Sequence, residues 1–180
     1  NQLRNYPQSN RNVLKRSRAK TDHHRQVARK FGKEYFDGDR DYGYGGYNYN
    51  PRFWEPVIPT FEDCYSLTKD HKVLDVGCGK GFMLYDMWRL IPGIEVRGID
   101  ISQYAYDNLI KEIRPYIDVG NAKELPYSDN SFDLVISINT IHNLGKSDCI
   151  QALQEIERVS KGHSFITVDA YRSHGEKERM

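Results

Sequence analysis

Long apolar runs and paired cysteines are both missing from this sequence of 180 residues. No apolar stretch approaches the roughly 20 residues that a membrane-spanning helix needs, so we expect no membrane partner. Cys64, Cys78 and Cys149 form no C-x-x-C pair, which argues against a disulfide framework and against a zinc site. No charged and then apolar leader begins at Asn1, so we expect a protein of the reducing cytoplasm that holds no metal.

Acidic residues are nearly missing from the first part of the chain. Residues 1–33 hold ten basic residues and one acid, Asp22, whereas residues 34–180 hold sixteen basic and twenty-four acidic residues. The basic arm could bind nucleic acid or another polyanion, although no nucleic-acid recognition motif accompanies it. It could equally be a solvated helix face that docks on the acidic body or on a second subunit, which would make the protein a homo-oligomer.

Residues 1–68 have the pattern of an N-terminal extension. Residues 12–31 lack proline and glycine and carry apolar residues at helical spacing, which predicts one or two helices. Residues 35–49 are rich in tyrosine and glycine without a clear period, which predicts an ordered loop or a loop that closes over a site. A helix should then lead into the core, because apolar residues recur at helical offsets beside Pro56 and Pro59: Val57, Ile58, Phe61 and Tyr65.

Residues 69–180 alternate between short apolar runs and helical patterns. The predicted strands are residues 72–76, 95–99, 116–119, 132–138 and 163–170, and the predicted helices are residues 82–90, 102–113 and 148–160. Strands that alternate with helices form βαβ units. The pattern therefore predicts an α/β fold, a Rossmann-like core whose parallel sheet is flanked by helices.

A glycine-rich turn follows the first predicted strand. Asp75 ends the strand, and Gly77, Gly79 and Gly81 follow at alternating positions before the next helix. Such a turn lets a ligand approach the backbone without meeting side chains. Alone it is weak evidence, because nicotinamide and flavin proteins also use one and some such turns are purely structural.

The spacing of the glycines favours one ligand over another. In the dinucleotide fingerprint the third glycine comes one position later, where this chain has Phe82, and the loop places a helix N-terminus on a pyrophosphate. S-adenosylmethionine has no phosphate but carries an ammonium and a sulfonium, so an acid such as Asp75 suits it. Asp100 ends the second strand, where a carboxylate can accept hydrogen bonds from two ribose hydroxyls, although it could instead only cap the next helix.

Four segments in order resemble successive motifs of the class I S-adenosylmethionine-dependent methyltransferases: Val73 to Gly81, Asp100, Gly120 to Pro126 and Phe132 to Asn139. The resemblance implies S-adenosylmethionine as cofactor and S-adenosylhomocysteine as product. The residues that it implies for cofactor binding are Asp75, Gly77, Cys78, Gly79, Gly81, Asp100, Ile101, Asn121 and Ala122, with Asn139 beside the methyl-bearing sulfur.

The chain departs from this family in two places. Asn121 stands where the family often has Asp, which keeps an acceptor for the adenine amino group but removes the charge. The family's sheet usually continues past the fifth strand with a helix and an antiparallel hairpin, whereas this sequence stops at Met180, so the resemblance covers roughly residues 70–171. We expect the C-terminal hairpin to be missing, unless a partner closes that sheet edge.

The methyl acceptor is harder to identify. His142 follows the fourth strand at the ligand-binding edge of the sheet and is our candidate general base, although it could equally pack on the next helix. Four residues of the tyrosine-rich loop are candidates for lining the acceptor site, unless that loop is an oligomer interface: Tyr35, Tyr42, Tyr44 and Tyr47. The segment also resembles the leader of small bacterial methyltransferases of unsettled substrate, some of them near surface-sugar genes.

The leading hypothesis is thus an enzyme that methylates O or N of a small molecule, such as a sugar derivative. A cofactor-binding module without catalysis that scaffolds a partner through its basic arm is the first alternative. A nucleic-acid methyltransferase that uses residues 1–33 is the second, and a dehydrogenase is a minor third.

Overall fold

The computed structural model describes residues 1–7 and 21–169, and in this part of the chain the core is one parallel sheet with strand order β3-β2-β1-β4-β5. The strands are β1 (Lys72–Val76), β2 (Glu95–Asp100), β3 (Ile117–Val119), β4 (Leu134–Ile138) and β5 (Ser164–Thr167). The predicted α/β fold is confirmed. Strand order reverses beside β1, whose neighbours are β2 and β4, and ligands of such sheets bind at the carboxyl ends of the strands beside this switch point.

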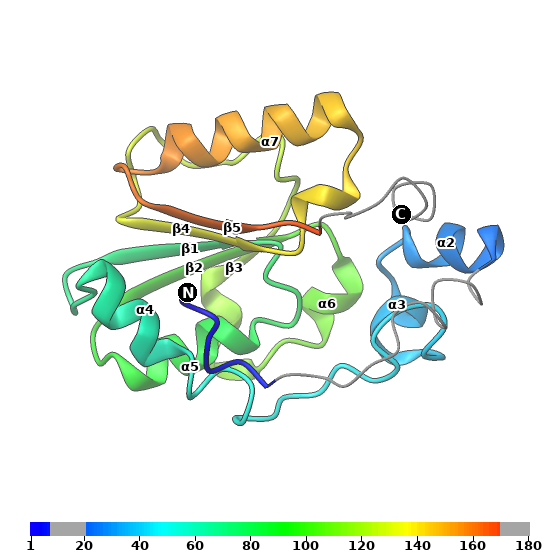
Figure 1. Cartoon of the computed structure of the whole chain (residues 1–180), viewed down its shortest axis with the longest axis horizontal. Coiled ribbons are helices and arrows are strands. Elements are labelled where there is room, and N and C mark those ends of the chain that lie inside the picture. The colour runs from blue at the N-terminus through cyan, green and yellow to red at the C-terminus, as the bar shows by residue number, and fades with distance from the viewer. Residues whose placement is uncertain (8–20, 170–180) are drawn as a thin grey trace.

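Helices cover both faces of the sheet, with α7 on one face and α4 and α5 on the other (Figure 1). The helices are α2 (Asp22–Ala28), α3 (Lys33–Asp37), α4 (Ile58–Tyr65), α5 (Phe82–Leu90), α6 (Gln103–Asp107) and α7 (Lys146–Val159), with 3-10 helices η1 (Lys111–Tyr116) and η2 (Ile141–Asn143). Of the helices expected over residues 12–31, only α2 can be compared, because residues 8–20 lie outside the described part. Residues 170–180, which follow β5, also lie outside it.

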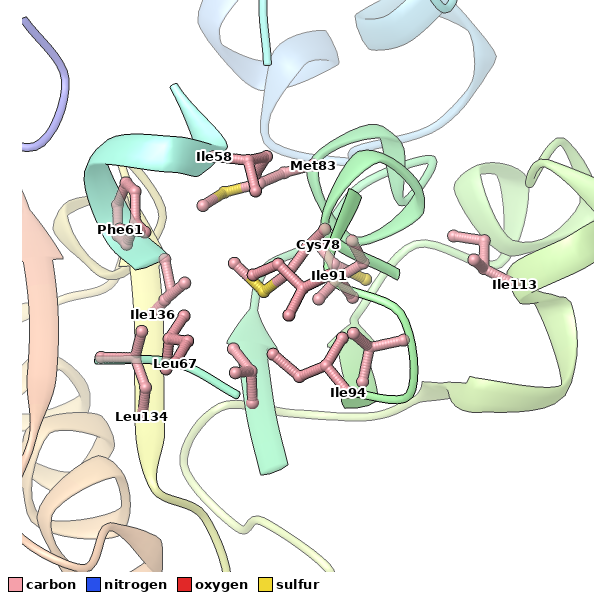
Figure 2. Close-up of a cluster of buried hydrophobic side chains, with 14 of the residues drawn as sticks. Ile58, Phe61, Leu67, Cys78, Met83, Ile91, Ile94, Ile113, Leu134 and Ile136 are labelled. Atoms are coloured by element: carbon pink, nitrogen blue, oxygen red, sulfur yellow. The ribbon is translucent and has the colours of Figure 1, made fainter. Parts of the chain in front are cut away.

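Apolar side chains of α4 join the core directly. Ile58 and Phe61 are fully buried in the same cluster as Leu134 and Ile136 of β4 (Figure 2). The Phe61 ring also meets that of Phe165 edge-on, with 5.0 Å between ring centroids. The helix that leads into the core therefore packs on one face of the sheet, as strands buried on both faces require.

The helix predicted over residues 102–113 is wrong as one continuous helix. Ser102 caps α6 as expected, accepting a hydrogen bond of 3.0 Å from the Ala105 amide, but α6 ends at Asp107 and the 3-10 helix η1 follows. Pro115 has no amide hydrogen and disfavours α-helical backbone in the residue before it. Ile113 therefore reaches the core from a 3-10 turn, where it is fully buried.

The tyrosine-rich segment is also not a loop throughout. Its first residues, Tyr35 to Asp37, belong to the short helix α3, and the loop proper begins at Gly38. Phe36 is the one buried residue of α3, so one face of the helix is fixed to the rest of the protein.

Residues 1–7 and 21–169 hold no membrane-spanning helix, metal-binding cluster or disulfide. No helix there is long and apolar enough to cross a membrane. No group of three or more His, Cys, Asp or Glu side chains there could hold a metal ion. Cys64, Cys78 and Cys149 are free thiols.

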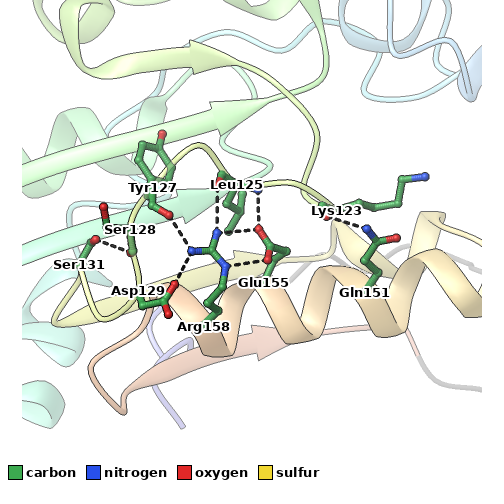
Figure 3. A network of polar contacts seen from close by, with 9 residues as sticks. All are labelled: Lys123, Leu125, Tyr127, Ser128, Asp129, Ser131, Gln151, Glu155 and Arg158. Atoms are coloured by element: carbon green, nitrogen blue, oxygen red, sulfur yellow. Dashed lines mark hydrogen bonds and ion pairs between the residues drawn. The ribbon is translucent and has the colours of Figure 1, made fainter.

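A network centred on Arg158 of α7 fixes the polar loop after β3 (Figure 3). The guanidinium donates to the carbonyl oxygens of Leu125 and Tyr127 at 3.0 and 2.7 Å and pairs with the carboxylates of Asp129 and Glu155 at 2.8 and 2.7 Å. Glu155 in turn accepts from the Leu125 amide at 2.8 Å. One arginine thus satisfies several groups of a loop without regular structure.

Arg158→Met should lower the free energy of unfolding by about 1 to 3 kcal/mol, because it leaves carbonyl and carboxylate groups without their donor. Urea unfolding measures the change. Lys161→Met is the control, since it removes one ion pair with Asp133 in which the lysine is exposed, and such pairs contribute about 0 to 1 kcal/mol. Equal losses in both variants would contradict a special role for the Arg158 network.

Candidate active site

A cavity of about 320 Å³ lies at the carboxyl ends of the strands, beside the switch point. Its floor comes from residues that end or follow four strands: residues 75–79, 99–101, 120–122 and 138–140. Its other walls come from the N-terminal part of the chain and from residues 143–144 after β4. Strands far apart in the sequence therefore contribute to one site, as their parallel order predicts.

The glycine turn after β1 has the backbone that only glycine adopts readily. Gly77 has φ +85°, and its amide donates to the carbonyl of Ile99 at 2.7 Å, which ties the turn to β2. A Cβ atom at Gly77 would lie 2.2 Å from Cγ2 and Oγ1 of Thr140. Gly77 therefore lets the end of β4 approach the turn, and together with Cys78 and Gly79 it lines the cavity.

Gly81 lies outside the cavity, although the sequence predicts it as a cofactor-binding residue. It does not line the cavity but precedes α5 with φ +75°, and a Cβ atom there would lie 2.2 Å from Cδ1 of Ile113. The third glycine of the motif thus allows η1 to pack against the start of α5. Its expected contact with the cofactor has no support in this geometry.

Two carboxylates face the cavity, and burial opposes the charge on both. Asp75 is 6% exposed, and burial, with a smaller effect from the charge of Asp100, raises its pKa to about 7. Burial also raises the pKa of Asp100, although its oxygens accept from the amides of Gly79 at 2.7 Å and Ser102 at 2.9 Å. The cavity therefore favours a positively charged ligand.

The other residues that line the cavity also favour a positively charged ligand. Among the described residues that line the cavity there is no Lys, Arg or His. A pyrophosphate would meet two acids and no cation, whereas the ammonium and sulfonium of S-adenosylmethionine would meet opposite charge. The two acids and the lack of a cation among the described lining residues favour S-adenosylmethionine over a dinucleotide.

The residues after β2 and β3 form one side of the cavity. Ile101 lines it and is 54% exposed, so its side chain is available to a ligand in the cavity. Asn121 and Ala122 also line it, and Asn121 Oδ1 accepts from the Lys123 amide at 3.0 Å, which holds the turn. These are the positions that the sequence predicts for the ribose and adenine side.

Asn139 lines the cavity at the end of β4, as expected. It has the left-handed φ of +54°, and Thr167 of β5 holds it. The Asn139 amide donates to the Thr167 carbonyl at 3.0 Å, and its Oδ1 accepts from the Thr167 hydroxyl at 3.1 Å. The fifth strand thus sets the position of a cavity residue.

His142 does not line the cavity, which removes the geometric basis for its expected role as a general base. Its Nε2 lies 3.6 Å from Oδ2 of Asp169, and its Nδ1 is buried without a hydrogen-bond partner among the described residues. In the 3-10 helix η2 successive side chains point in different directions. Asn143 lines the cavity from this turn, and His142 points elsewhere.

Three of the four predicted tyrosines, Tyr35, Tyr44 and Tyr47, line the cavity. The Tyr44 and Tyr47 rings lie 4.3 Å apart between centroids, and Tyr47 also stacks on Phe82 at 4.7 Å. Tyr42 does not line the cavity. Its amide donates to the carbonyl of Asp39 in a turn, and its ring packs edge-on against His24 at 5.3 Å instead.

Sequence reasoning missed a second aromatic wall, which includes Leu3, Tyr6 and Trp54. The Tyr6 and Trp54 rings meet edge-on with 5.0 Å between centroids. The first residues are held against the start of α4, where Asn5 Nδ2 donates to the Pro56 carbonyl at 3.0 Å. No periodicity links residues so far apart in the sequence, so no sequence signal could have joined them.

Comparison with known proteins bears on the same residues. A family model described as a methyltransferase domain matches residues 74–168, more than half of the chain. Two curated relatives are a demethylmenaquinone methyltransferase of Symbiobacterium thermophilum, 36% identical over 56% of this chain and 43% of the relative, and an arginine-hydroxylase of Rattus norvegicus, 31% identical over 54% of this chain and 28% of the relative. The chain thus spans less than half the length of either.

A solved S-adenosylmethionine-dependent methyltransferase of Aquifex aeolicus has the same fold. The likeness has a TM-score of 0.52 at 19% identity and covers 68% of this chain and 71% of that one. It supports the fold alone, whereas the family match covers the glycine turn, Asp100 and Asn139. The chain belongs to the class I S-adenosylmethionine-dependent methyltransferases, whose cofactor is S-adenosylmethionine.

Proposed function

We propose that this protein transfers a methyl group from S-adenosylmethionine to O or N of a small molecule, such as a sugar derivative. The observation that carries the proposal is the cavity at the switch point. It holds one buried and one partly buried acid, no described basic residue, and walls of aromatic rings. The acids suit a cationic cofactor, and the rings suit the flat or apolar faces of a small acceptor.

The residues that we propose for the cofactor come from four strand ends. Asp75 and the backbone of Gly77 to Gly79, with Cys78 between the glycines, would meet the methionine part. Asp100 would accept from the ribose, and Ile101, Asn121 and Ala122 would contact the adenine. Asn139 would lie near the sulfur. The bound cofactor supplies a methyl group on a sulfonium, which is already activated for transfer.

Tyr35, Tyr44 and Tyr47 are our candidates for the acceptor wall, together with Tyr6 and Trp54. Their rings would orient the acceptor and keep water out, which is what an in-line methyl transfer chiefly requires of the protein. The proposal assigns no general base. The described lining holds no histidine, so the proposal favours a neutral amine or an acidic hydroxyl of the acceptor, which needs no base, over an ordinary sugar hydroxyl, whose proton a base would have to take.

Three wider proposals accompany this one. The extension of residues 1–68 would cover the site, and residues 69–180 would form the methyltransferase core. The basic arm within residues 1–33 would dock on a second copy of the chain, and the protein would act in the cytoplasm. Each follows from the composition of the sequence and needs its own test, the arm by deletion and measurement of molecular mass.

Isothermal titration with S-adenosylmethionine, and separately with NAD, tests the cofactor, and transfer of labelled methyl groups to fractionated small-molecule extracts tests the reaction. We expect S-adenosylmethionine to bind and label to reach a small molecule. Binding without transfer would favour the scaffolding module, and binding of NAD alone would contradict the proposal. Methyl transfer to RNA or DNA, together with nucleic-acid binding whose affinity falls steeply as the salt concentration rises, would favour a nucleic-acid methyltransferase.

Asp100→Ala should weaken S-adenosylmethionine binding about tenfold to a hundredfold without unfolding the protein, because it removes charge-assisted hydrogen bonds to the ribose. Titration calorimetry and thermal unfolding measure the two effects. Asp107→Ala is the matched control, since Asp107 ends α6 and does not line the cavity. Unchanged affinity in Asp100→Ala would refute the ribose assignment.

A further inference from the structure

Lys80 lies inside the glycine turn, yet its side chain does not line the cavity. The residue is 4% exposed. Its Nζ donates to Oδ2 of Asp37 at 2.6 Å and to the carbonyl oxygen of Tyr47 at 2.8 Å. It also lies 5.8 Å from the centre of the Tyr104 ring. The only lysine of the cofactor turn is therefore committed to the tyrosine-rich segment.

The Asp37 carboxylate accepts two further hydrogen bonds. Its Oδ1 accepts from the Tyr47 amide at 2.9 Å, and its Oδ2 accepts from the Tyr104 hydroxyl at 2.7 Å. Burial alone would raise the pKa of Asp37, but the hydrogen bonds from Lys80, Tyr47 and Tyr104 together bring that pKa below its ordinary value. One carboxylate thus joins the end of α3, the glycine turn and α6.

These contacts close the loop between Asp37 and Tyr47. Both ends of the loop are held at Asp37, and Lys80 holds both to the turn. The Tyr47 ring rests against the turn, because a Cβ atom placed on Gly79 would lie 3.4 Å from its Cε1. Tyr44, which lies between these ends, lines the cavity beside Tyr47.

We propose that Lys80 is a positioning residue, whose ion pair with Asp37 holds the loop of residues 38–46 closed on the glycine turn and so sets the affinity for the cofactor. The proposal rests on the proposed function, because it takes the cavity as the cofactor site. A buried ion pair is a weak source of net stability, but removal of one partner leaves the other charge without compensation. Loss of the pair should therefore open this loop first.

Asp37→Asn tests the pair with little change of shape. Asp133→Asn is its matched control, because Asp133 also pairs with one lysine, Lys161 at 2.9 Å, and accepts from one backbone amide, that of Lys72 at 2.8 Å. It lies next to β4 outside the cavity. The two variants thus lose the same kind of contact in different places.

The first measurement is tryptic cleavage of the ligand-free proteins, followed by mass spectrometry. Cleavage after Arg40 reports opening of the loop, and cleavage after Arg97, which lies in strand β2 between β1 and β3, reports unfolding of the core. In Asp37→Asn we expect cleavage after Arg40 to become at least about tenfold faster relative to cleavage after Arg97. In Asp133→Asn the rate after Arg40 should stay that of the wild type. Equal rates after Arg40 in Asp37→Asn and the wild type would overturn the proposal.

The second measurement is the Kd for S-adenosylmethionine by titration calorimetry. We expect a rise of about tenfold in Asp37→Asn and in Lys80→Met, no further rise in the double variant, and recovery of most of the affinity in Asp37→Glu, which restores the charge. A loop that opens with unchanged Kd would overturn the link to the cofactor. A wild type that binds no S-adenosylmethionine would refute the proposed function and this link with it, whereas the cleavage rates, measured without ligand, would still decide whether the pair holds the loop.

Discussion

Asp75→Asn should make the ligand-free protein more stable at pH 8 while it destroys most of its affinity for S-adenosylmethionine. Burial and Asp100 raise the pKa of Asp75 from 3.8 to about 7 in the folded protein. At pH 8 the folded protein must therefore hold an ionised carboxylate that its surroundings disfavour, at a cost of about 4 kcal/mol at 1.36 kcal/mol for each unit. Asparagine avoids that cost.

The sign of the pH dependence follows from the raised pKa. Below pH 4 the carboxyl is protonated in both states and costs nothing. Between about pH 4 and pH 7 the unfolded chain has lost the proton and the folded protein has kept it, so stability falls as pH rises. The advantage of the variant should thus grow from about pH 4 and be complete above pH 7.

Urea unfolding at pH 4, 6 and 8 measures the difference between the variant and the wild type. Asp107→Asn serves as the control, because Asp107 is exposed and should show no such trend. A difference between Asp75→Asn and the wild type that stays constant with pH would contradict the account of Asp75.

Cofactor binding should show the opposite preference. A cationic ligand favours ionised Asp75, so the wild-type affinity for S-adenosylmethionine should rise with pH as the solution passes pH 7. Asp75→Asn lacks this rise and should bind at least about a hundredfold more weakly at pH 8, by analogy with other buried charge-assisted contacts. Ionised Asp75 thus destabilises the ligand-free protein, and a bound cationic ligand compensates for that loss of stability.

The sheet was predictable because its strands are short apolar runs. Residues 72–76 and 95–99 match β1 and all but the last residue of β2, since central parallel strands are buried on both faces and need no alternating pattern. Strand order then brings Asp75, Asp100 and Asn139 to one edge without any further information. This is why the cofactor side of the cavity follows from motifs alone.

Side-chain direction was not predictable in the same way. Gly81 and His142 belong to the right segments, but Gly81 meets Ile113 and His142 points to Asp169. Which residue of a turn faces a ligand depends on the dihedral angles of that turn, and a motif states only the order of residues. Tyr42 is a further case, because a turn at Asp39 directs its ring to His24.

Contacts between segments that are far apart in the chain could not be predicted from the sequence. Leu3 and Trp54 share a wall of the cavity although fifty residues separate them, and neither belongs to a motif. The motif places Lys80 in the turn but does not identify its partner, because Asp37 lies in a segment that is predicted only as a loop. A lysine between two glycines of a cofactor turn was the available signal, because so large a side chain must find space outside the turn.

Gly77→Ala should destabilise the protein strongly and abolish its binding of S-adenosylmethionine. The residue has φ +85°, where an L-residue loses about 1 to 2 kcal/mol. The new Cβ would also lie 2.2 Å from two atoms of Thr140, and such overpacking costs about 1 to 3 kcal/mol more. We expect a loss of about 2 to 5 kcal/mol in the free energy of unfolding and no measurable S-adenosylmethionine binding, because both residues line the cavity.

Two further variants separate the strained backbone from the steric clash. Gly162→Ala is the control for strain alone, because Gly162 has φ +124° but nothing lies within 4 Å of a Cβ atom there. Thr140→Gly in the Gly77→Ala background removes the clashing atoms and should recover stability until only a loss like that of Gly162→Ala is left. Urea unfolding of the four proteins, wild type included, checks both steps. If Thr140→Gly recovered no stability, glycine at position 77 would be required only for its backbone conformation. The explanation that Gly77 makes room for Thr140 after β4 would then be refuted.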